Sequence, residues 1–351
     1  MKKKIKINSK INPYEVNFSN NLEQCFNNLK KETIFVVDNK VYEIYLKKII
    51  KNKKFIILSS SEKTKDFLSL KKIINFFINN VSKNTLVVAV GGGVIQDVTS
   101  FLSSIFKRGI DWYFFPTTLI SQGDSCIGGK TSINYNKLKN QLGNFYPPKK
   151  IIINSDFLRN ISKKEIFSGF GELGHYFFLS NIKDYEYYKK SLLNFSKNKK
   201  INLNEMIFRS LNIKKRYIEK DEFDQNIRLK LNYGHTFGHA IENLVTIPHG
   251  IAVAHGMNIS NFVSYKLGYL NFNQFNIMED TLKIILKKYP IKKVNLKKFK
   301  EIIRKDKKSI NKKIRVILSK GIGNMFVTKI NNEKKFIKIL NEYFNRKLSI
   351  R

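Results

Sequence analysis

Residues 87–97 read VVAVGGGVIQD, an apolar run that ends in three glycines and continues as a helix-forming segment. A buried strand followed by a glycine turn and a helix is typical of a parallel sheet covered by helices. The glycines let a ligand phosphate approach the backbone, and the new helix offers unpaired N–H groups and a positive dipole end. Because the stretch is not the G-x-G-x-x-G fingerprint, the alternative that it merely turns the chain stays open.

Short apolar runs, alternating with longer amphipathic stretches, flank this segment on both sides. Each run is rich in β-branched or aromatic residues and ends near a turn or a helix start. Lys4–Ile7 and Tyr14–Asn17 predict an edge hairpin with Pro13 in its turn. The other runs predict strands at Thr33–Val37, Phe55–Leu58, Thr85–Val90, Trp112–Phe115 and Ile151–Ile153. The first half is therefore predicted to be an α/β domain with a Rossmann-like parallel sheet.

Beyond Pro147 and Pro148 the pattern changes to long segments of helical period, with few strand candidates. Helices are predicted at Lys163–Phe178, Leu203–Lys220 and His235–Leu244. One late exception, Ile314–Leu318 with Met325–Thr328, predicts a short hairpin carried on the helical part. We therefore predict two domains, an α/β nucleotide-binding domain over residues 1–150 and a mostly α-helical domain over 151–351.

The chain is strongly basic, with 65 Lys and Arg against 27 Asp and Glu and a formal net charge of +38. Such a charge would attract nucleic acid or an anionic membrane if it were gathered on one face. Lysine is instead spread from end to end among Ile, Asn and Phe, residues with codons rich in A and T. Compositional drift in an AT-rich genome therefore explains the charge better, and neither nucleic acid nor membrane is expected as a partner.

Cysteine usage and hydropathy predict a cytoplasmic protein. Cys25 and Cys126 lie far apart without C-x-x-C spacing, which fits a reducing compartment. The residues from Met1 to Pro13 carry lysines but lack the apolar stretch of a secretory signal. No apolar run reaches the ~18 residues of a membrane-spanning helix.

All five histidines lie in the predicted helical domain, at positions 175, 235, 239, 249 and 255. Glu172 and His175 are three residues apart, and His235 and His239 four apart, so each pair shares one helix face. A carboxylate and two imidazoles around a divalent ion are the usual composition of a catalytic zinc-type site. A single histidine would more often belong to the core, but several beside glycine-rich turns favour a metal site.

Three basic residues are also candidates for binding an anion. Lys130 follows two glycines in an apolar, low-charge stretch, where a lysine needs an anionic partner. Arg228 lies four residues before Asn232, near the candidate metal histidines, and arginine is suited to a bidentate grip on carboxylate or phosphate. Lys214 belongs to the same group, although any one lysine of so many is most often solvated surface.

Taken together, these motifs resemble the 3-dehydroquinate synthases, and the resemblance runs from about Glu62 to Gly323. The stretches that carry it are Gly91–Ile95 with Asp97, Arg108–Asp111, Pro116–Leu119, Asp124–Thr131, Leu231–Glu242 and Asp306–Lys308. The resemblance implies catalytic NAD, a divalent zinc or cobalt ion and a sugar phosphate substrate. It implies conversion of 3-deoxy-arabino-heptulosonate 7-phosphate to 3-dehydroquinate and phosphate in the shikimate pathway, with NAD regenerated in each turnover.

The resemblance also assigns residues to roles. The implied metal ligands are Glu172, His235 and His249. The implied NAD contacts are Glu62, Lys65, Gly93, Val94, Ile95, Gln96, Asp97, Thr117, Thr118, Lys130, Lys139, Phe157, Leu158, Arg159 and Asn160. The implied contacts to substrate phosphate and hydroxyls are Asp124, Lys130, Asn140, Asn232, His239 and one of Lys307 or Lys308. Lys214 and Arg228 match positions that hold the substrate carboxylate, and Arg108 matches one that crosses a homodimer interface.

Three positions depart from the family pattern. Gln96 replaces a glycine and is expected to crowd the glycine turn and weaken NAD binding. His175 replaces an active-site lysine; its shorter side chain, which titrates near about pH 6.5, is expected to slow the enzyme or make it pH-dependent. The alternative is that His175 becomes a fourth metal ligand and closes the site. Ile251 replaces a glutamate after His249 and removes a partner for that histidine.

Three competing functions stay open on the sequence alone. A related sugar phosphate cyclase would not need the carboxylate grip of Lys214 and Arg228. A metal-dependent polyol dehydrogenase of the same two-domain build would accumulate NADH. A basic nucleic-acid-binding protein is disfavoured because the charge is dispersed and no aromatic-basic motif is visible.

Overall fold

The computed structural model describes residues 3–29, 32–136, 138–291, 294–305 and 314–346. Contacts divide the chain into two compact units. The α/β unit comprises Met1–Ile161 with Lys215–Phe223, and the helical unit comprises Ser162–Lys214 with Asp224–Arg351. Each unit is described by itself below.

The α/β unit is built on a seven-stranded sheet with the strand order β1-β2-β9-β6-β5-β3-β4. The strands are β1 (Lys4–Ile7), β2 (Tyr14–Phe18), β3 (Thr33–Asp38), β4 (Lys54–Leu58), β5 (Leu86–Gly91), β6 (Trp112–Pro116) and β9 (Lys150–Ile153). Only β1 and β2 pair antiparallel, and every other neighbouring pair is parallel. The predicted parallel sheet and edge hairpin are therefore confirmed.

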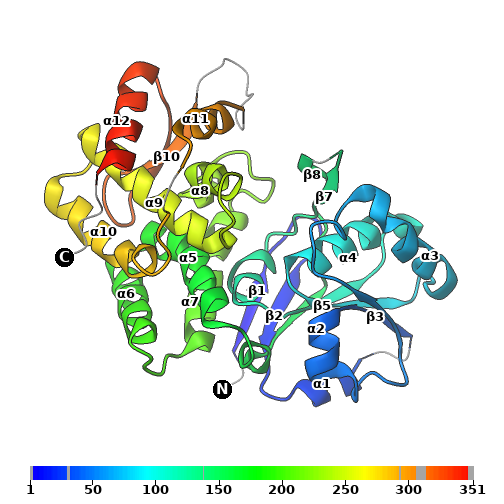
Figure 1. Cartoon of the computed structure of the whole chain (residues 1–351). Coiled ribbons are helices and arrows are strands. Elements are labelled where there is room, and N and C mark those ends of the chain that lie inside the picture. Colours follow the sequence, from blue (N-terminus) through cyan, green and yellow to red (C-terminus); the bar gives the residue numbers. More distant parts are fainter. Residues whose placement is uncertain (1–2, 30–31, 137, 292–293, 306–313, 347–351) are drawn as a thin grey trace. The chain divides into compact units, whose positions relative to one another are not determined.

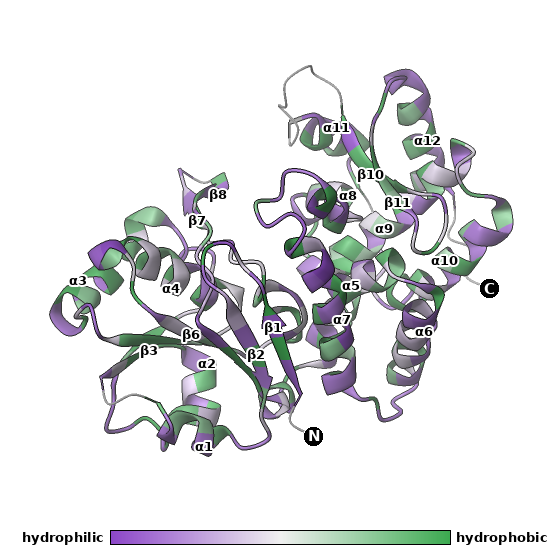
Figure 2. Ribbon diagram, turned by 180° about the vertical axis from the view of Figure 1, so that it is seen from behind, coloured by the Kyte–Doolittle hydropathy of each residue, from purple (hydrophilic) through white to green (hydrophobic). Residues whose placement is uncertain are grey.

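Helices cover both faces of this sheet, with α1 (Leu22–Asn27) and α2 (Asn39–Val41) on one face and α3 (Lys71–Asn80) and α4 (Gly93–Ile105) on the other (Figure 1). The core under α1 contains alternate residues of β3 and β5, as two-sided burial requires. The Phe26 ring of α1 stacks on the Phe115 ring of β6 with centroids 4.6 Å apart. Figure 2 shows β3 hydrophobic along its length, as expected for an inner strand. Short helical turns complete the unit: η1 (Tyr42–Leu46), η2 (Phe67–Leu70), η3 (Phe106–Arg108), η4 (Ser121–Ser125) and η5 (Ser155–Leu158).

A second, small hairpin in the α/β unit was not among the strands predicted from sequence. It consists of β7 (Ile133–Tyr135) and β8 (Leu138–Leu142), which pair antiparallel with an irregular register. The β8 segment reads LKNQL and is largely exposed, so it lacks the alternating apolar pattern that marks a strand. This hairpin carries the candidate residues Lys139 and Asn140.

The helical unit is organised around α9 (His249–Lys266), which is buried along most of its length. It packs against α5 (Lys163–Leu179), α8 (His235–Glu242), α10 (Phe272–Leu286) and α12 (Glu333–Asn345) (Figure 1). The remaining elements are α6 (Ile182–Ser196), α7 (Leu203–Ile218), η6 (Ile227–Asn232), α11 (Leu296–Lys305), β10 (Arg315–Ser319) and β11 (Met325–Lys329). The last residues of α7, from Lys215 on, belong to the α/β unit. The predicted late hairpin is confirmed, because β10 and β11 pair antiparallel. No helix in the described ranges is long and apolar enough to span a bilayer.

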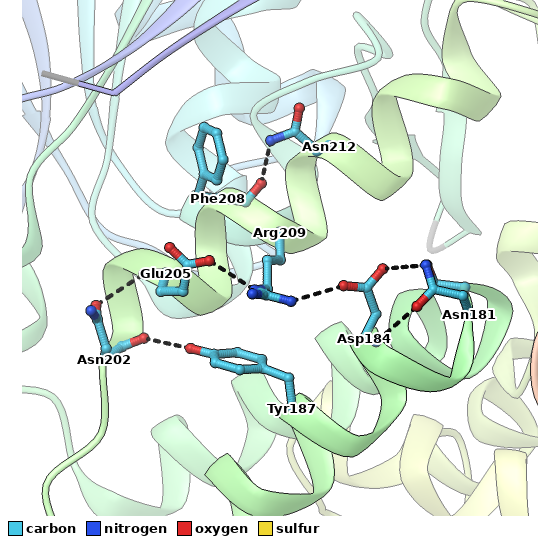
Figure 3. A network of polar contacts seen from close by, with 9 residues as sticks. Asn181, Asp184, Tyr187, Asn202, Glu205, Phe208, Arg209 and Asn212 are labelled. Carbon is cyan, nitrogen blue, oxygen red and sulfur yellow. Dashed lines mark hydrogen bonds and ion pairs between the residues drawn. The ribbon is translucent and has the colours of Figure 1, made fainter. Parts of the chain in front are cut away.

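A network of polar side chains fixes α7, the helix that carries Lys214, against α6 (Figure 3). The Arg209 guanidinium donates to Glu205 at 2.8 Å and to Asp184 at 3.1 Å, and it lies over the Tyr187 ring. Because the guanidinium is held from both helices, α7 has little freedom to slide along α6.

Candidate active site

Helices α5, α8 and α9 approach each other closely because glycines lie where they cross. A Cβ atom on Gly250 would lie 1.8 Å from the carbonyl oxygen of Ser168, and one on Gly171 would lie 2.0 Å from that of Gly250. A Cβ atom on Gly256 of α9 would likewise lie 2.0 Å from the carbonyl oxygen of Gly234, just before α8. Glycine is required here for close backbone approach, which brings the middle of α5 next to the first turns of α8 and α9.

Glu172, His235 and His249 meet at this crossing, from the middle of α5 and the first residues of α8 and α9. Glu172 Oε1 lies 3.2 Å from His235 Nε2, and Glu172 Oε2 lies 3.3 Å from His249 Nε2. Only 3% of the Glu172 surface is exposed. One buried carboxylate therefore contacts both imidazoles, each with a different oxygen.

The cluster is electrostatically arranged around a positive charge. Burial raises the pKa of the Glu172 carboxyl, but the imidazoles of His235 and His249 outweigh burial and hold that pKa well below its usual range. Burial lowers the pKa of His249, but the carboxylates of Glu172 and Glu242 outweigh it and raise the pKa to about 10. The buried Glu172 carboxylate thus requires a positive charge beside it, which the protonated His249 supplies here. This is expected of a metal site in which a proton takes the place of the ion.

His249 has a carboxylate partner on its second ring nitrogen, supplied by Glu242. Glu242 at the end of α8 accepts a hydrogen bond from His249 Nδ1 at 2.9 Å. Ile251 is fully buried among the helices. Ile251 therefore offers His249 no polar partner, as predicted, but His249 is not left without one, because Glu242 supplies a carboxylate that fixes the ring and directs Nε2 at Glu172.

The two other histidines of the predicted site also lie at this cluster. The His239 ring lies 5.5 Å from that of His235 and 5.6 Å from that of His249, centroid to centroid. Burial and the neighbouring imidazoles lower the pKa of His239 to about 3, so this ring is neutral near pH 7. His175 is 1% exposed, and its ring centroid lies 5.1 Å from that of His235.

The donor set fits a divalent metal ion. In the described part of the chain, His235 Nδ1 is buried without a hydrogen-bond partner. Unpaired polar atoms in a buried site need an ion or water, since each costs about 1–3 kcal/mol when left unsatisfied. A carboxylate with neutral imidazoles is a ligand set that zinc and cobalt accept.

Two basic candidate residues of the helical unit are buried. Arg228 in η6 is 4% exposed and Lys214 on α7 is 7% exposed. Asn232, which ends η6, donates to the Leu229 carbonyl at 3.2 Å. Lys307 and Lys308 lie outside the described residues.

In the α/β unit, the predicted nucleotide contacts follow the carboxyl ends of parallel strands. Gly93–Asp97 follows β5, and Thr117 with Thr118 follows β6. Glu62 and Lys65 come after β4, and Phe157–Asn160 comes after β9. Carboxyl ends of parallel strands share one edge of a sheet, where open α/β sheets bind their ligands.

Polar side chains at this edge form a connected network. The Lys65 ammonium is 2.6 Å from Asp97 Oδ2 and donates to Asn140 Oδ1 at 2.8 Å. Asn134 donates to Glu62 Oε2 at 2.7 Å and accepts from the Asn140 backbone N–H at 2.9 Å. The network therefore brings together four predicted residues, Glu62, Lys65, Asp97 and Asn140, and adds Asn134, which the sequence did not indicate.

The expected weakening of NAD binding by Gln96 stays a prediction, but Gln96 does not crowd the glycine turn. Its side chain is 5% exposed and points to the loop that carries Asp124, where it donates to the Ser125 carbonyl at 2.7 Å. The Ser125 hydroxyl donates back to Gln96 Oε1 at 2.6 Å. Gln96 therefore ties the first turn of α4 to the loop.

Replacing Gln96 with alanine tests this tie. Because both Gln96 hydrogen bonds are lost, we expect Gln96→Ala to lower the free energy of unfolding by about 1–3 kcal/mol. Urea unfolding monitored by circular dichroism measures the change. Gln141→Ala on exposed β8 is the matched control, and equal midpoints for the two variants would show that the Ser125 contacts contribute nothing.

The other predicted residues of the α/β unit are more exposed. The Lys130 side chain is exposed, so burial does not require an anionic partner for it, and its contact with an anion stays a prediction. Lys139 is exposed and Asp124 is half-buried. Arg108 is exposed with a left-handed backbone, at φ +64°. Phe157 and Leu158 are buried, Arg159 pairs with Asp156 at 2.7 Å, and Asn160 donates to the Tyr45 hydroxyl at 3.1 Å.

Sequence reasoning missed a further residue that fixes this sheet edge. Gln122 is fully buried and donates to the carbonyl of Pro116, the last residue of β6, at 3.0 Å and to that of Asn154, which follows β9, at 2.9 Å. Its signal in the sequence was an amide inside the apolar stretch between two strands. Buried amides are hydrogen-bonded, so such a residue indicates a backbone-bridging role.

The fold and the cluster define the class: an enzyme with an α/β unit built on a mostly parallel sheet and a helical unit that holds a carboxylate–histidine cluster. Comparison with known families matches 3-dehydroquinate synthase N-terminal to residues 55–168 and 3-dehydroquinate synthase C-terminal to residues 169–309. A 3-dehydroquinate synthase of Helicobacter pylori (strain P12) is 37% identical over 326 residues, covering 90% of this chain and 93% of the relative. The chain belongs to the 3-dehydroquinate synthase family.

Solved structures agree with the fold. A 2-deoxy-scyllo-inosose synthase complexed with carbaglucose-6-phosphate, NAD⁺ and Co²⁺ is 21% identical with a TM-score of 0.85, covering 97% of this chain and 100% of that one. A 2-epi-5-epi-valiolone synthase from Streptomyces hygroscopicus with NAD⁺ and Zn²⁺ bound is 19% identical with a TM-score of 0.83, covering 95% and 97%. At these identities the likeness concerns the fold alone.

Proposed function

We propose that the chain catalyses the reaction of its family, converting 3-deoxy-arabino-heptulosonate 7-phosphate to 3-dehydroquinate and phosphate. The proposal rests on one observation: in a chain of this family, His235 and His249 both contact the buried carboxylate of Glu172. The relationship over both family halves supports it, since relatives of 37% identity are 3-dehydroquinate synthases.

NAD and a divalent metal ion are the proposed cofactors. Residues 1–150 would form the domain that binds NAD, and residues 151–351 the domain that binds metal and substrate. The neighbouring structures with NAD⁺ and Co²⁺ or Zn²⁺ support both assignments. When bound, the ion would acidify the substrate hydroxyl that is oxidised, and NAD would accept and return two electrons.

The chain's own residues would bind and orient the substrate. Lys214 and Arg228, both buried, would hold its carboxylate, and their fixed charges would also stabilise negative charge that develops during phosphate elimination. His239, neutral near pH 7, would donate or accept a hydrogen bond at a hydroxyl without adding charge. The proposed contacts to the phosphate and the remaining hydroxyls are Asp124, Lys130, Asn140, Asn232 and one of Lys307 or Lys308.

One incubation tests the reaction type. Purified protein with the heptulosonate phosphate, NAD⁺ and zinc is expected to give 3-dehydroquinate and phosphate in equal amounts with no net rise in NADH absorbance. Accumulating NADH without phosphate would indicate a polyol dehydrogenase and would contradict the proposal. Turnover of a sugar phosphate that lacks the carboxylate, in preference to the heptulosonate, would indicate another cyclase.

The variant Arg228→Lys tests whether Arg228 binds the substrate carboxylate. Lysine keeps the charge but loses the bidentate fork, so we expect kcat/KM for the heptulosonate phosphate to fall about 10–100-fold, the equivalent of ~1.5–3 kcal/mol. Steady-state kinetics measure this, and Arg216→Lys on the exposed side of α7 is the matched control. Unchanged kinetics in Arg228→Lys would remove Arg228 from the proposed site.

The Lys65–Asp97 pair predicts a pH dependence of NAD binding. Burial raises the pKa of the Asp97 carboxyl to about 6, although the Lys65 ammonium lowers it. As the pH falls through 6, Asp97 takes up a proton and loses its negative charge and part of its capacity to accept hydrogen bonds from NAD. We expect NAD affinity to be constant above pH 7 and to fall by about tenfold per pH unit below 6, measured by calorimetry. Asp97→Asn should flatten this profile, and the same slope in the variant would contradict the assignment.

We also infer a cytoplasmic homodimer in which the exposed Arg108 reaches the partner subunit. Family membership supports the dimer, and the free cysteines Cys25 and Cys126 fit a reducing compartment. Light scattering of the wild type and of Arg108→Ala tests the dimer, and a monomeric wild type at micromolar concentration would contradict it.

A further inference from the structure

His175 lies one turn after Glu172 on α5 and faces the same cluster. Its Nδ1 atom is 4.0 Å from Glu172 Oε1, which itself lies 3.2 Å from His235 Nε2. The ligand atoms of Glu172, His175 and His235 all lie within 4.8 Å of one another. His175 is 1% exposed, so its imidazole is committed to the protein interior rather than to solvent.

These separations are close to those that a shared ion requires. Bonds of about 2.1 Å at tetrahedral angles place neighbouring ligand atoms about 3.4 Å apart. The Glu172–His235 distance of 3.2 Å is already in this range, and the Glu172–His175 distance of 4.0 Å exceeds it by less than an ångström. A glutamate and a histidine at i and i+3 on one helix also bind a common metal in carboxylate-bridged helical bundles.

We propose that His175 is a fourth protein ligand of the ion bound by Glu172, His235 and His249. The proposal rests on the metal site of the proposed function. Neutral imidazole binds zinc or cobalt, whereas the protonated lysine that the family pattern places here cannot. This chain would therefore hold its metal with three imidazoles, and a substrate hydroxyl would join as a fifth ligand or displace His175.

Zinc-edge X-ray absorption of the purified zinc-loaded protein counts the imidazole ligands directly. We expect three imidazoles in the wild type and two in His175→Gln. In competition with a chelator, His175→Gln should also bind zinc about 100-fold more weakly, the upper end of what loss of a supporting partner costs. His255→Gln is the matched control, because His255 is a buried histidine of the same unit that bonds to the Tyr289 carbonyl at 2.9 Å, away from the cluster.

The outcomes separate this proposal from the proposed function. Two imidazoles in the wild type, with equal zinc affinity in His175→Gln, would overturn the role of His175 and leave the metal site in place. A wild type that binds no zinc or cobalt would overturn both. If His175→Gln does not fold, the wild-type imidazole count decides the proposal alone.

Discussion

Glu172→Gln is expected to lower kcat/KM for phosphate release by at least ~1000-fold and to leave the protein without stoichiometric zinc. The amide keeps the shape of the side chain but removes the buried negative charge that both His235 and His249 face. Loss of the ion would remove several kcal/mol of transition-state stabilisation, and each ~1.4 kcal/mol is a factor of ten in rate. Steady-state kinetics and metal analysis of the purified variant measure the two effects.

Glu165→Gln provides the matched control on the same helix. Glu165 is exposed and closes the capping box of α5 with Ser162, a role that glutamine also fills. This control is expected to retain wild-type activity and zinc content. Full activity in Glu172→Gln would mean that the carboxylate is not needed for the reaction.

Gly250→Ala is expected to destabilise the helical unit by about 3 kcal/mol or more and to weaken zinc binding together with it. The added methyl would overlap the Ser168 carbonyl on α5, at 1.8 Å, so α9 would have to move away from α5. A backbone carbonyl cannot rotate aside as a side chain does. The loss of stability is therefore expected at the upper end of the range for overpacked sites. Moving α9 would also separate His249 from Glu172.

Urea unfolding and chelator competition measure the stability and the zinc affinity of Gly250→Ala. Gly93→Ala is the stability control, because a Cβ atom there meets nothing within 4 Å. Equal stability of Gly250→Ala and the wild type would show that the α5–α9 contact is not as close as described. Lost stability with unchanged zinc affinity would show that the crossing does not position the cluster.

The sheet could be predicted from the sequence because its inner strands are buried on both faces. Val87–Val90 and Trp112–Phe115 are continuous apolar runs, and burial of both faces requires this pattern. The β7–β8 hairpin could not be predicted, because the β8 residues are polar and exposed and carry no period. Its position depends on tertiary contacts such as the hydrogen bond from Lys65 to Asn140.

The candidate metal cluster was indicated by residue types, but its contacts were not. Histidine pairs at helical spacing showed that ligands could share a helix face, whereas the crossing of α5 and α9 depends on glycines whose role is visible only in three dimensions. Side-chain direction caused the errors. Gln96 points to Ser125 instead of the glycine turn, and Glu242, which was not predicted to contact His249, accepts its hydrogen bond.

The proposal that phosphate release requires both NAD and a divalent metal ion is tested with protein stripped of both cofactors. The heptulosonate phosphate would be supplied with NAD⁺ and zinc together, with each alone, and with neither. We expect phosphate release only when both are present, and recovery of full activity when the missing one is added back. Release that continues unchanged after either cofactor has been removed would contradict it.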